Sequence, residues 1–497
     1  MYLYKFRFDF FLIYFLRLQY RHLSVVNNFM EELYMKKIIT ACVMLLFCSL
    51  LVFAAGGQQS GGGGGAAAPA TTMTGTIGNN LKYDLGAPVN KGQNITLEFW
   101  IQNEYQAIYP KLADEYTKIH PNVKINITSA AYQDLWPKLA IALQTGTGPD
   151  ISHMHNSQDA NLVPLLAPYP ENILPLAALK ADFNQVDEHV QNGKLYYIDS
   201  GIMTSGIFYN KKMWREAGLT DADIPTSWDK LIEVAKKLTK YDAAGNITRE
   251  GFSINDNNQY ILQALALQSG RFLFDVNGNP IVNNDIWKQN MKFIQDFYTV
   301  YKVSSTQFPV GNEAFVNEQG AMAYIWGWAG TWLANYPNLE WGFFNLPSKD
   351  GKPAPAYDRN NGDSTFVVSK SARPEAQAVG FDMIKYLLCN DDMLVNIAML
   401  FNEVPVKKNL LNNPTILSNV VLNAQSKIID RTIWPGAVPD PYFTTINTYA
   451  VQAVILNNAN IDTAMADTQN MLERDFVKAF PNFRPVERQY AHASELQ

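Results

Sequence analysis

The sequence predicts an α/β fold in which helices cover the faces of a parallel sheet, and residues 93–161 provide the evidence for it. Two stretches with alternating apolar residues, Ile95–Trp100 and Val123–Ile127, have the period of half-buried strands. Apolar and aromatic residues recur at helical spacing after each of them, over 108–119 and over 135–143. A strand–helix order that repeats in this way requires crossover connections, which place the helices on the sheet.

Turn residues separate these elements. Pro121 and Asn122 follow the first predicted helix and release the second strand. Gly146, Pro149 and Asp150, in the sequence G-T-G-P-D, end the second helix and lead into a short third strand. The segment therefore reads as strand, helix, strand, helix, strand.

Helix and hairpin signals continue along the rest of the chain. Residues 192–197 have a hairpin sequence, and Gly218 ends a helix that begins after Lys212. Thr226 or Ser227 caps the start of another helix, which runs through residue 238. The further predicted elements are turn-rich hairpins at 242–246 and 275–279, helices at 260–268, 374–388, 446–456 and 461–476, a buried strand ending in aromatic residues within 321–328, and a turn and strand at 361–369.

The N-terminal residues predict export. Met35 and two lysines precede an apolar run that closes on small residues, and Val52-Phe53-Ala54 fits cleavage after Ala54. We therefore expect a signal peptide and a periplasmic protein. The predicted segments are an upstream extension from a mis-assigned start at 1–34, the signal peptide at 35–54 and a Gly/Ala-rich flexible linker at 55–92.

The cysteine positions and the net charge indicate what to expect for lipid anchoring, disulfide bonds and anionic binding partners. Cys48 lies inside the apolar run and no cysteine stands near Gly56, so a soluble protein is favoured over a lipid-anchored one. Cys42 and Cys48 leave with the signal peptide, and Cys389 alone remains, so no intramolecular disulfide is expected. The formal net charge of −6 is unfavourable for binding nucleic acid or an anionic membrane surface.

Three motifs resemble family 1 of the bacterial extracellular solute-binding proteins, the sugar-capturing subunits of ABC importers. They are G-K-x-Y…Y-N-K…A-G-L within 193–219, P-T-S-W-x-x-L at 225–231, and the segment 315–328 that contains G-A-M before its tryptophans. The resemblance extends in order from about residue 95 to residue 476. One departure is Asp199-Ser200, where the family usually has a proline.

The resemblance implies a two-lobed periplasmic-binding-protein fold of type II, with a ligand cleft between the lobes. The implied lobes are residues 93–202 with 363–405, and residues 203–362 with 406–497. The chain would cross between them near Ile202, Gly362 and Pro405, and these crossings would form a hinge. A monomer is implied that binds a carbohydrate and delivers it to an inner-membrane permease, without catalysis or a cofactor.

Candidate ligand contacts follow from the chemistry of a sugar, which needs aromatic platforms for its rings and polar groups for its hydroxyls. Residues just after strands are the best placed, since ligands of open α/β sheets lie beyond the carboxyl ends of strands. The position of Trp328 matches a stacking tryptophan of the maltose-binding relatives. The candidates are Trp100, Asn103, Glu104, Tyr132, Gln133, His155, Asn156, Gln158, Trp326, Trp328, Asn361, Gly362, Asp363 and Trp434.

Other functions have weaker support in the sequence. An exported glycoside hydrolase would need two carboxylates facing one bond, and Glu104 with Asp363 is the candidate pair. A binding protein for a polyol phosphate or a peptide is a further alternative, which the scarcity of arginine near the expected cleft disfavours. His153, His155 and Asp150 lack a suitably spaced partner, so no metal site is expected.

Overall fold

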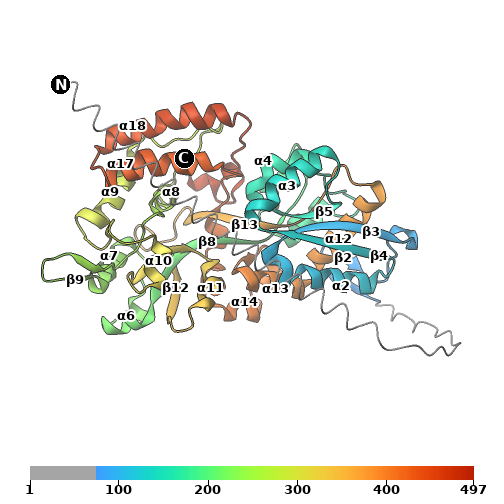
Figure 1. Cartoon of the computed structure of the whole chain (residues 1–497), viewed down its shortest axis with the longest axis horizontal. Helices are drawn as coiled ribbons and strands as arrows, with labels where there is room; N and C mark the ends of the chain where they lie inside the picture. The colour runs from blue at the N-terminus through green and yellow to red at the C-terminus, as the bar shows by residue number, and fades with distance from the viewer. Residues whose placement is uncertain (1–73) are drawn as a thin grey trace, which may run out of the picture. The chain divides into compact units, whose positions relative to one another are not determined.

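The parallel sheet predicted near the start of the chain is present in the computed structural model, which describes residues 74–497 (Figure 1). β3 (Ile95–Gln102) lies between β4 (Val123–Ala130) and β5 (Ile151–His155), and both pairs are parallel. The three predicted strands are therefore confirmed, and the first two extend beyond their predicted ends. The predicted extension, the signal peptide and the linker up to residue 73 lie outside the described residues. The rest of the predicted linker is not flexible in the structure, because Leu81, Tyr83 and Val89 are buried in the core that contains Phe99.

Two helices cover opposite faces of this sheet. α2 (Tyr109–Ile119) packs into the core that contains Phe99, and α3 (Tyr132–Thr145) packs into a second core that Trp100 adjoins. Successive strand residues point to opposite faces, so neighbouring residues of β3 serve different helices. Gly146 follows α3 with a φ of 70°, a left-handed conformation that glycine adopts without steric cost. The predicted helix end is thus confirmed.

Three strands lie side by side at the positions where the resemblance implied that the chain crosses between the lobes. They are β8 (Asp199–Asn210), β13 (Asp358–Val368) and β14 (Val404–Pro405). Ile202 of β8 pairs with Gly362 of β13 and with Val404 of β14, and both pairings are antiparallel. Backbone hydrogen bonds therefore join the three strands into one ribbon.

The same ribbon continues into both lobes. Beyond the crossing, β8 pairs with β11 (Met322–Trp326) and β12 (Trp341–Asn345). In the other direction β13 pairs with β5, while its first residues pair with β15 (Thr432–Ile433). Within residues 74–497, nine strands thus form one sheet that spans the two lobes.

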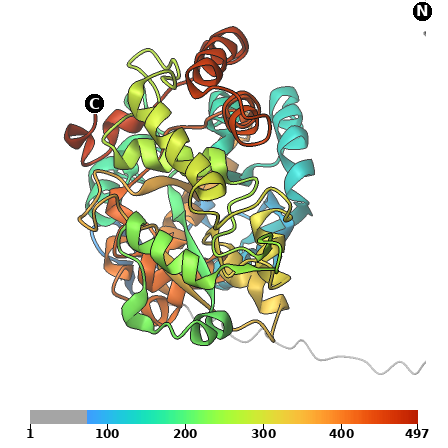
Figure 2. The ribbon, with the colours of Figure 1, turned by 90° about the vertical axis from the view of Figure 1, so that its left-hand side faces the viewer.

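Helices build the core of the second lobe, which contains β11 and β12. α7 (Trp228–Leu238) starts where the sequence predicts, because the side chain of Ser227 accepts a hydrogen bond from the backbone N–H of Lys230. α8 (Asn258–Gln268) packs against α9 (Asp285–Thr299), and α18 (Ile461–Met471) also packs against α9. Figure 2 views this lobe from its end, with the red C-terminal helices beside the yellow-green ones.

The other predicted helices are also present, with changes at their ends. α6 (Lys211–Glu216) is followed by Gly218 at a φ of 71°, and α12 (Pro374–Cys389) begins at its predicted proline. The helix predicted at 446–456 is a π-helix (Ile446–Gln452) that continues as α17 (Ala453–Ile455). A second π-helical segment, Leu472–Val477, continues α18.

The remaining elements are short. The strands are β1 (Thr76–Gly78), β2 (Lys82–Asp84), β6 (Val190–Gln191), β7 (Lys194–Leu195), β9 (Lys240–Tyr241) and β10 (Ile247–Arg249). The α-helices are α4 (Asp159–Leu162), α5 (Leu176–Asp182), α10 (Gly311–Val316), α11 (Ala329–Trp332), α13 (Asp391–Phe401), α14 (Pro414–Ser418), α15 (Val420–Gln425) and α16 (Asp440–Thr445). No helix in residues 74–497 has the length and apolar character that a membrane crossing requires.

The core of the first lobe, built around β3, β4 and β5, takes in residues beyond Pro405. Val406, Leu410 and Ile416 are buried in it, although the resemblance assigned 406–497 to the second lobe. The chain turns back into the first lobe after β14, so the apolar residues that follow this strand are buried in the first-lobe core. The exact lobe boundaries stay a prediction.

Two buried carboxyl groups lie at the crossing. Asp363 follows Gly362 in β13, and its carboxylate accepts a hydrogen bond from the hydroxyl of Tyr105. Glu403, which directly precedes β14, is fully buried. Burial, and then the nearby charge of Asp363, raise the pKa of the Glu403 carboxyl well above its usual value. Folding therefore favours the protonated, neutral form of Glu403.

Replacing Glu403 with glutamine is expected to make stability less sensitive to rising pH. A carboxyl whose pKa is raised by folding stabilises the protein fully below its unfolded pKa of about 4.3. This stabilisation is lost as the pH rises toward the folded pKa, at up to about 1.4 kcal/mol per pH unit. Urea unfolding of wild type and Glu403→Gln across this range measures the difference. The exposed Glu313→Gln should keep the wild-type slope, and a wild-type slope for Glu403→Gln would contradict the prediction.

Candidate functional site

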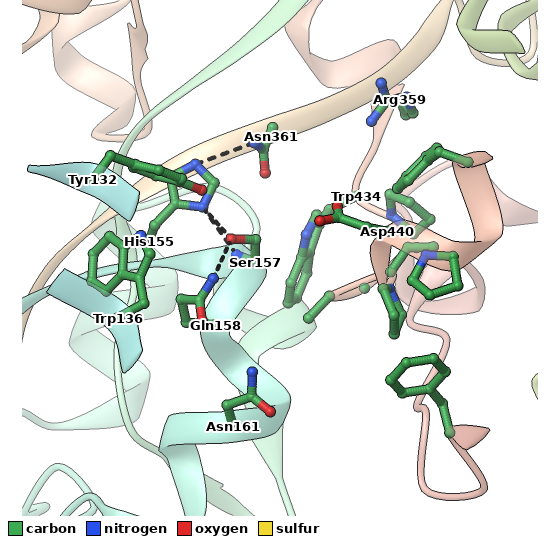
Figure 3. Close-up of a pocket in the computed structure, with 18 of the residues that line it drawn as sticks. Tyr132, Trp136, His155, Ser157, Gln158, Asn161, Arg359, Asn361, Trp434 and Asp440 are labelled. Carbon is green, nitrogen blue, oxygen red and sulfur yellow. Dashed lines mark hydrogen bonds between the residues drawn. The ribbon is translucent and has the colours of Figure 1, made fainter. Parts of the chain in front are cut away.

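A cavity of about 630 Å³ lies beside the crossing strands, and segments far apart in the sequence form its wall (Figure 3). Tyr132 opens α3 directly after β4, and His155 ends β5. Both therefore stand at the carboxyl ends of parallel strands, where ligands of α/β sheets bind. Across the cavity stand Arg359 of β13 and the loop from Trp434 to Asp440. The volume is in the range of small-molecule sites.

His155 organises the first-lobe side of the cavity. The backbone N–H of Ser157 donates to its Nδ1 at 3.1 Å, so Nδ1 acts as an acceptor. The Ser157 hydroxyl lies 2.8 Å from the same atom, and the amide of Gln158 donates to that hydroxyl at 3.1 Å. The other ring nitrogen, Nε2, lies 3.3 Å from the amide nitrogen of Asn361 and 3.7 Å from Oδ1 of Asp363. His155 thus connects the cavity wall to the crossing strands.

Aromatic rings form much of the rest of the wall. Tyr132 stands edge-on to His155 and to Trp136, with ring centroids 5.7 and 5.6 Å apart. On the other side, the ring of Trp434 lies 4.7 Å from that of His189. His189 in turn contacts Asp199 at 3.0 Å. Trp434 is only 3% exposed, so this tryptophan joins the wall to the core beneath it.

Arg359 is the cationic side chain of the cavity wall. Its guanidinium lies 4.4 Å from the ring centroid of Tyr260, 4.6 Å from that of Trp326 and 5.0 Å from that of Phe443. Cation–π contacts of this kind hold a guanidinium in place without a carboxylate. The sequence reasoning missed Arg359, although it stands two residues before Asn361 on a strand and so points to the same side.

The structure brings six of the fourteen predicted contacts together in this cavity. They are Tyr132, Gln133, His155, Gln158, Asn361 and Trp434. Lining residues that the sequence reasoning did not select are Trp136, Pro137, Ser157, Asn161, Arg359, Asn360, Asp440, Phe443, Phe480 and the loop residues Pro435, Gly436, Ala437, Val438, Pro439 and Pro441. Helical spacing assigned Trp136 to packing, and no local signal marks the others, since their segments meet only in the folded chain.

The other predicted contacts of the first lobe lie outside the cavity wall. Trp100 packs against the α3 core, whereas Asn103 and Glu104 are exposed after β3. Asn156 is fully buried, and its amide lies 3.4 Å from a carboxylate oxygen of Asp199. Their contact with a ligand stays a prediction.

Four predicted contacts lie near the crossing or in the second lobe, also outside the wall. Gly362 and Asp363 belong to the crossing strand β13, and Asp363 is buried. Trp326 lies beneath Arg359, so it supports the wall without lining it. Trp328 is 38% exposed and stands edge-on to Trp332. Their direct contact with a ligand also stays a prediction.

The cavity wall has few residues that could bind a metal ion or act as a catalytic pair of carboxylates. Among residues 74–497, no group of three or more His, Cys, Asp and Glu side chains is placed to hold a metal ion. Of the described residues that line the cavity, Asp440 is the one with a carboxylate. The arrangement therefore offers amides, hydroxyls, aromatic rings and one cation, which are groups for binding.

Two lobes joined by three crossing strands, with a cavity beside the crossing, define a binding protein of the periplasmic type. The sequence profile of the bacterial extracellular solute-binding proteins matches residues 100–393. This chain therefore belongs to that family.

Individual relatives agree with this assignment. The chain is 26% identical over 307 residues to the arabinooligosaccharide-binding protein of Bacillus subtilis, covering 57% of this chain and 67% of the relative. It is 25% identical over 317 residues to the multiple sugar-binding protein of Streptococcus mutans, covering 61% and 73%.

Solved structures share the fold. A cyclo/maltodextrin-binding protein complexed with maltotetraose matches with a TM-score of 0.64 at 20% identity, covering 78% of this chain and 98% of that one. The maltose/maltodextrin-binding domain MalE of Bdellovibrio bacteriovorus, bound to maltotriose, matches with a TM-score of 0.60 at 18% identity, covering 77% and 100%. These matches confirm the two-lobed fold of type II that the sequence predicts.

Trp434 is expected to matter for stability far more than Trp328. Trp434→Ala removes a buried ring that packs on His189, and such substitutions cost about 3–5 kcal/mol. Trp328→Ala removes a partly exposed ring and should cost less than about 1 kcal/mol. Denaturant unfolding of both variants measures the difference. Equal losses would show that the burial of Trp434 does not contribute as the packing indicates.

Proposed function

We propose that this protein is the carbohydrate-binding component of an ABC importer, which captures a mono- or oligosaccharide and delivers it to a membrane permease. The observation that carries the proposal is the composition of the cavity wall. It combines the amide side chains of Gln133, Gln158 and Asn361 with the rings of Tyr132 and Trp434. Sugar hydroxyls bond to amides, and the apolar face of a sugar ring packs on an aromatic ring.

The named relatives support an oligosaccharide rather than a single sugar. Their names specify arabinooligosaccharides, multiple sugars, maltotriose and galactooligosaccharides as what those proteins bind. The cavity of about 630 Å³ is also in the size range of sites that bind small molecules. The proposal therefore places several ring-binding positions along the wall.

The proposal also includes the location of the protein, its oligomeric state and its membrane partner. The family is extracellular by description, and we place this protein in the periplasm, with residues 35–54 as its signal peptide. It would act as a monomer and meet the permease through surfaces of both lobes. No lipid anchor is proposed, because the sequence offers no well-placed cysteine.

A glycoside hydrolase remains the alternative to test, and the placement of carboxylates argues against it. Hydrolysis of a glycosidic bond needs two carboxyl groups on either side of the bond. Asp363 is buried and bonded to Tyr105, while Glu104 is exposed after β3. Among the described residues of the wall, Asp440 alone supplies a carboxylate. We therefore propose binding without turnover.

A sugar library tests the proposed function directly. Thermal unfolding should shift upward with at least one oligosaccharide, because a ligand that binds only the folded state stabilises it. Chromatography of the ligand after long incubation should recover it intact. Cleaved ligand would favour the hydrolase, and the absence of any shift across neutral and acidic sugars would contradict carbohydrate binding.

Tyr132→Ala is expected to weaken oligosaccharide binding by roughly 1–3 kcal/mol with little change in melting temperature. Tyr132 is partly exposed in the wall and lies at the margin of the α3 core, so its removal deletes a ring platform and costs less packing than the loss of a fully buried ring. Calorimetric titration measures the affinity. Tyr241→Ala is the matched control, since Tyr241 is exposed in β9, outside the cavity wall. Equal affinities of the two variants would remove Tyr132 from the site.

Ligand binding is also expected to close the lobes. Three crossings that share one ribbon allow rotation about it, and a ligand that contacts both sides of the cavity favours the closed state. Small-angle scattering at saturating ligand should therefore give a smaller radius of gyration than the ligand-free protein. An unchanged radius at saturation would contradict closure.

A further inference from the structure

Arg359 is a buried cation that faces the proposed ligand. The residue is only 9% exposed, and it lines the cavity on the same side as Trp434 and Asp440 (Figure 3). Its Nε atom is buried and has no hydrogen-bond partner among the described residues. No carboxylate of residues 74–497 is paired with its guanidinium at 4.0 Å or less. A buried charge without a counter-ion is costly to the folded protein.

The carboxylate of Asp358, which precedes Arg359 in the sequence, already accepts hydrogen bonds from other groups. Asp358 accepts hydrogen bonds from the hydroxyls of Tyr324, at 2.8 Å, and Ser205. It also accepts from the backbone N–H of Arg359 at 2.7 Å. Adjacent strand residues point to opposite faces, so Asp358 points into the protein while Arg359 points into the cavity. Asp358 therefore moderates the charge of Arg359 from behind without capping its guanidinium.

The carboxylate of Asp440, the other charged group of the wall, does not act as a counter-ion for Arg359. Asp440 is the first residue of α16 and is exposed, so water and the helix N-terminus both screen its charge. The facing residues on the opposite side are His155, Ser157, Gln158 and the ring of Tyr132. The buried part of the cavity thus has a positive group and no buried negative one among its described lining residues.

We propose that the cavity takes an acidic oligosaccharide, and that Arg359 pairs with the carboxylate of one of its uronic acid residues. The inference rests on the proposed function and names the class of sugar. The planar guanidinium matches a carboxylate with two parallel hydrogen bonds, and the rings of Tyr260, Trp326 and Phe443 hold it in one orientation. A neutral sugar would leave the charge without a counter-ion.

This inference revises one expectation from the sequence. The scarcity of arginine near the expected cleft disfavoured an anionic ligand, because Arg359 was not recognised as part of the wall. The structure places Arg359 in that wall, so the argument from scarcity no longer holds.

Matched sugar pairs test the proposal with the full mature protein. Each pair has the same length and linkage and differs in a C6 carboxylate against a C6 hydroxymethyl group, as in trigalacturonate and galactotriose, or in a glucuronosyl against a glucosyl branch on xylotriose. In at least one pair the acidic member should bind about tenfold tighter or more at low salt, as expected for a buried charge-assisted pair. The advantage should change little between about 20 and 300 mM salt, because a buried pair is poorly screened.

Variants assign the preference to Arg359. Arg359→Gln should reduce the ratio of acidic to neutral affinity to about one, and Arg359→Lys should retain part of it, because lysine keeps the charge but not the planar fork. Arg359→Met keeps an apolar stem among the rings and serves if the glutamine variant unfolds. Arg474→Gln, an exposed arginine paired with Asp475, should keep the wild-type ratio.

The outcomes separate this inference from the proposed function. If neutral members bind as tightly as acidic ones in every pair, the inference fails while sugar binding stands. A preference that survives in all three Arg359 variants would also overturn it. If no member of any pair binds to folded protein, both the inference and the proposed function fail.

Discussion

The pairing of β8 with β13 and β14 at Ile202 is the constraint on which the rest of the structure depends. β8 and β13 run through it from one lobe into the other, and both β13 and β14 are hydrogen-bonded to β8. Glycines permit this close approach. A side chain at Gly201 would bring its Cβ to 2.7 Å from Cβ of Glu403, and one at Gly362 would come to 2.8 Å from the carboxyl of Asp199. The glycines at these two positions therefore allow the strands of the crossing to lie close together.

The crossing also sets the chemistry of the cavity. Arg359, Asn361 and Asp363 are successive alternate residues of β13, two of them in the cavity wall and the third buried at the crossing. His155 lies between these environments, since its Nε2 is near both Asn361 and Asp363. A ligand that contacts Asn361 is thus one side chain away from the buried pair of Asp363 and Glu403. Residues of the cavity wall and residues of the crossing between the lobes therefore belong to one strand, β13.

Local structure could be predicted from the sequence because its causes are local. The cap at Ser227, the helix ends at Gly146 and Gly218 and the alternation of β3 each depend on a few neighbouring residues. The cavity depends on residues from β4, β5, β13 and the loop at Trp434 meeting in space, so sequence reasoning found only part of its wall. Arg359 was missed because nothing in its own segment shows that three rings from distant segments surround it. Trp326 was selected for a ligand, whereas its ring lies beneath that arginine.

The isolation of Cys389 makes the protein suited to site-directed labelling. Cys389 is the one cysteine among the described residues, and it is buried as a free thiol. Burial raises the pKa of this thiol to about 12, so almost none of it is thiolate at neutral pH, and thiolate is the species that reacts with maleimides. In a protein that begins after the proposed signal peptide, and so lacks Cys42 and Cys48, a cysteine introduced at the exposed position Asp440 would therefore take up a dye selectively, without first removing Cys389. A fluorophore there would report occupancy of the cavity in solution.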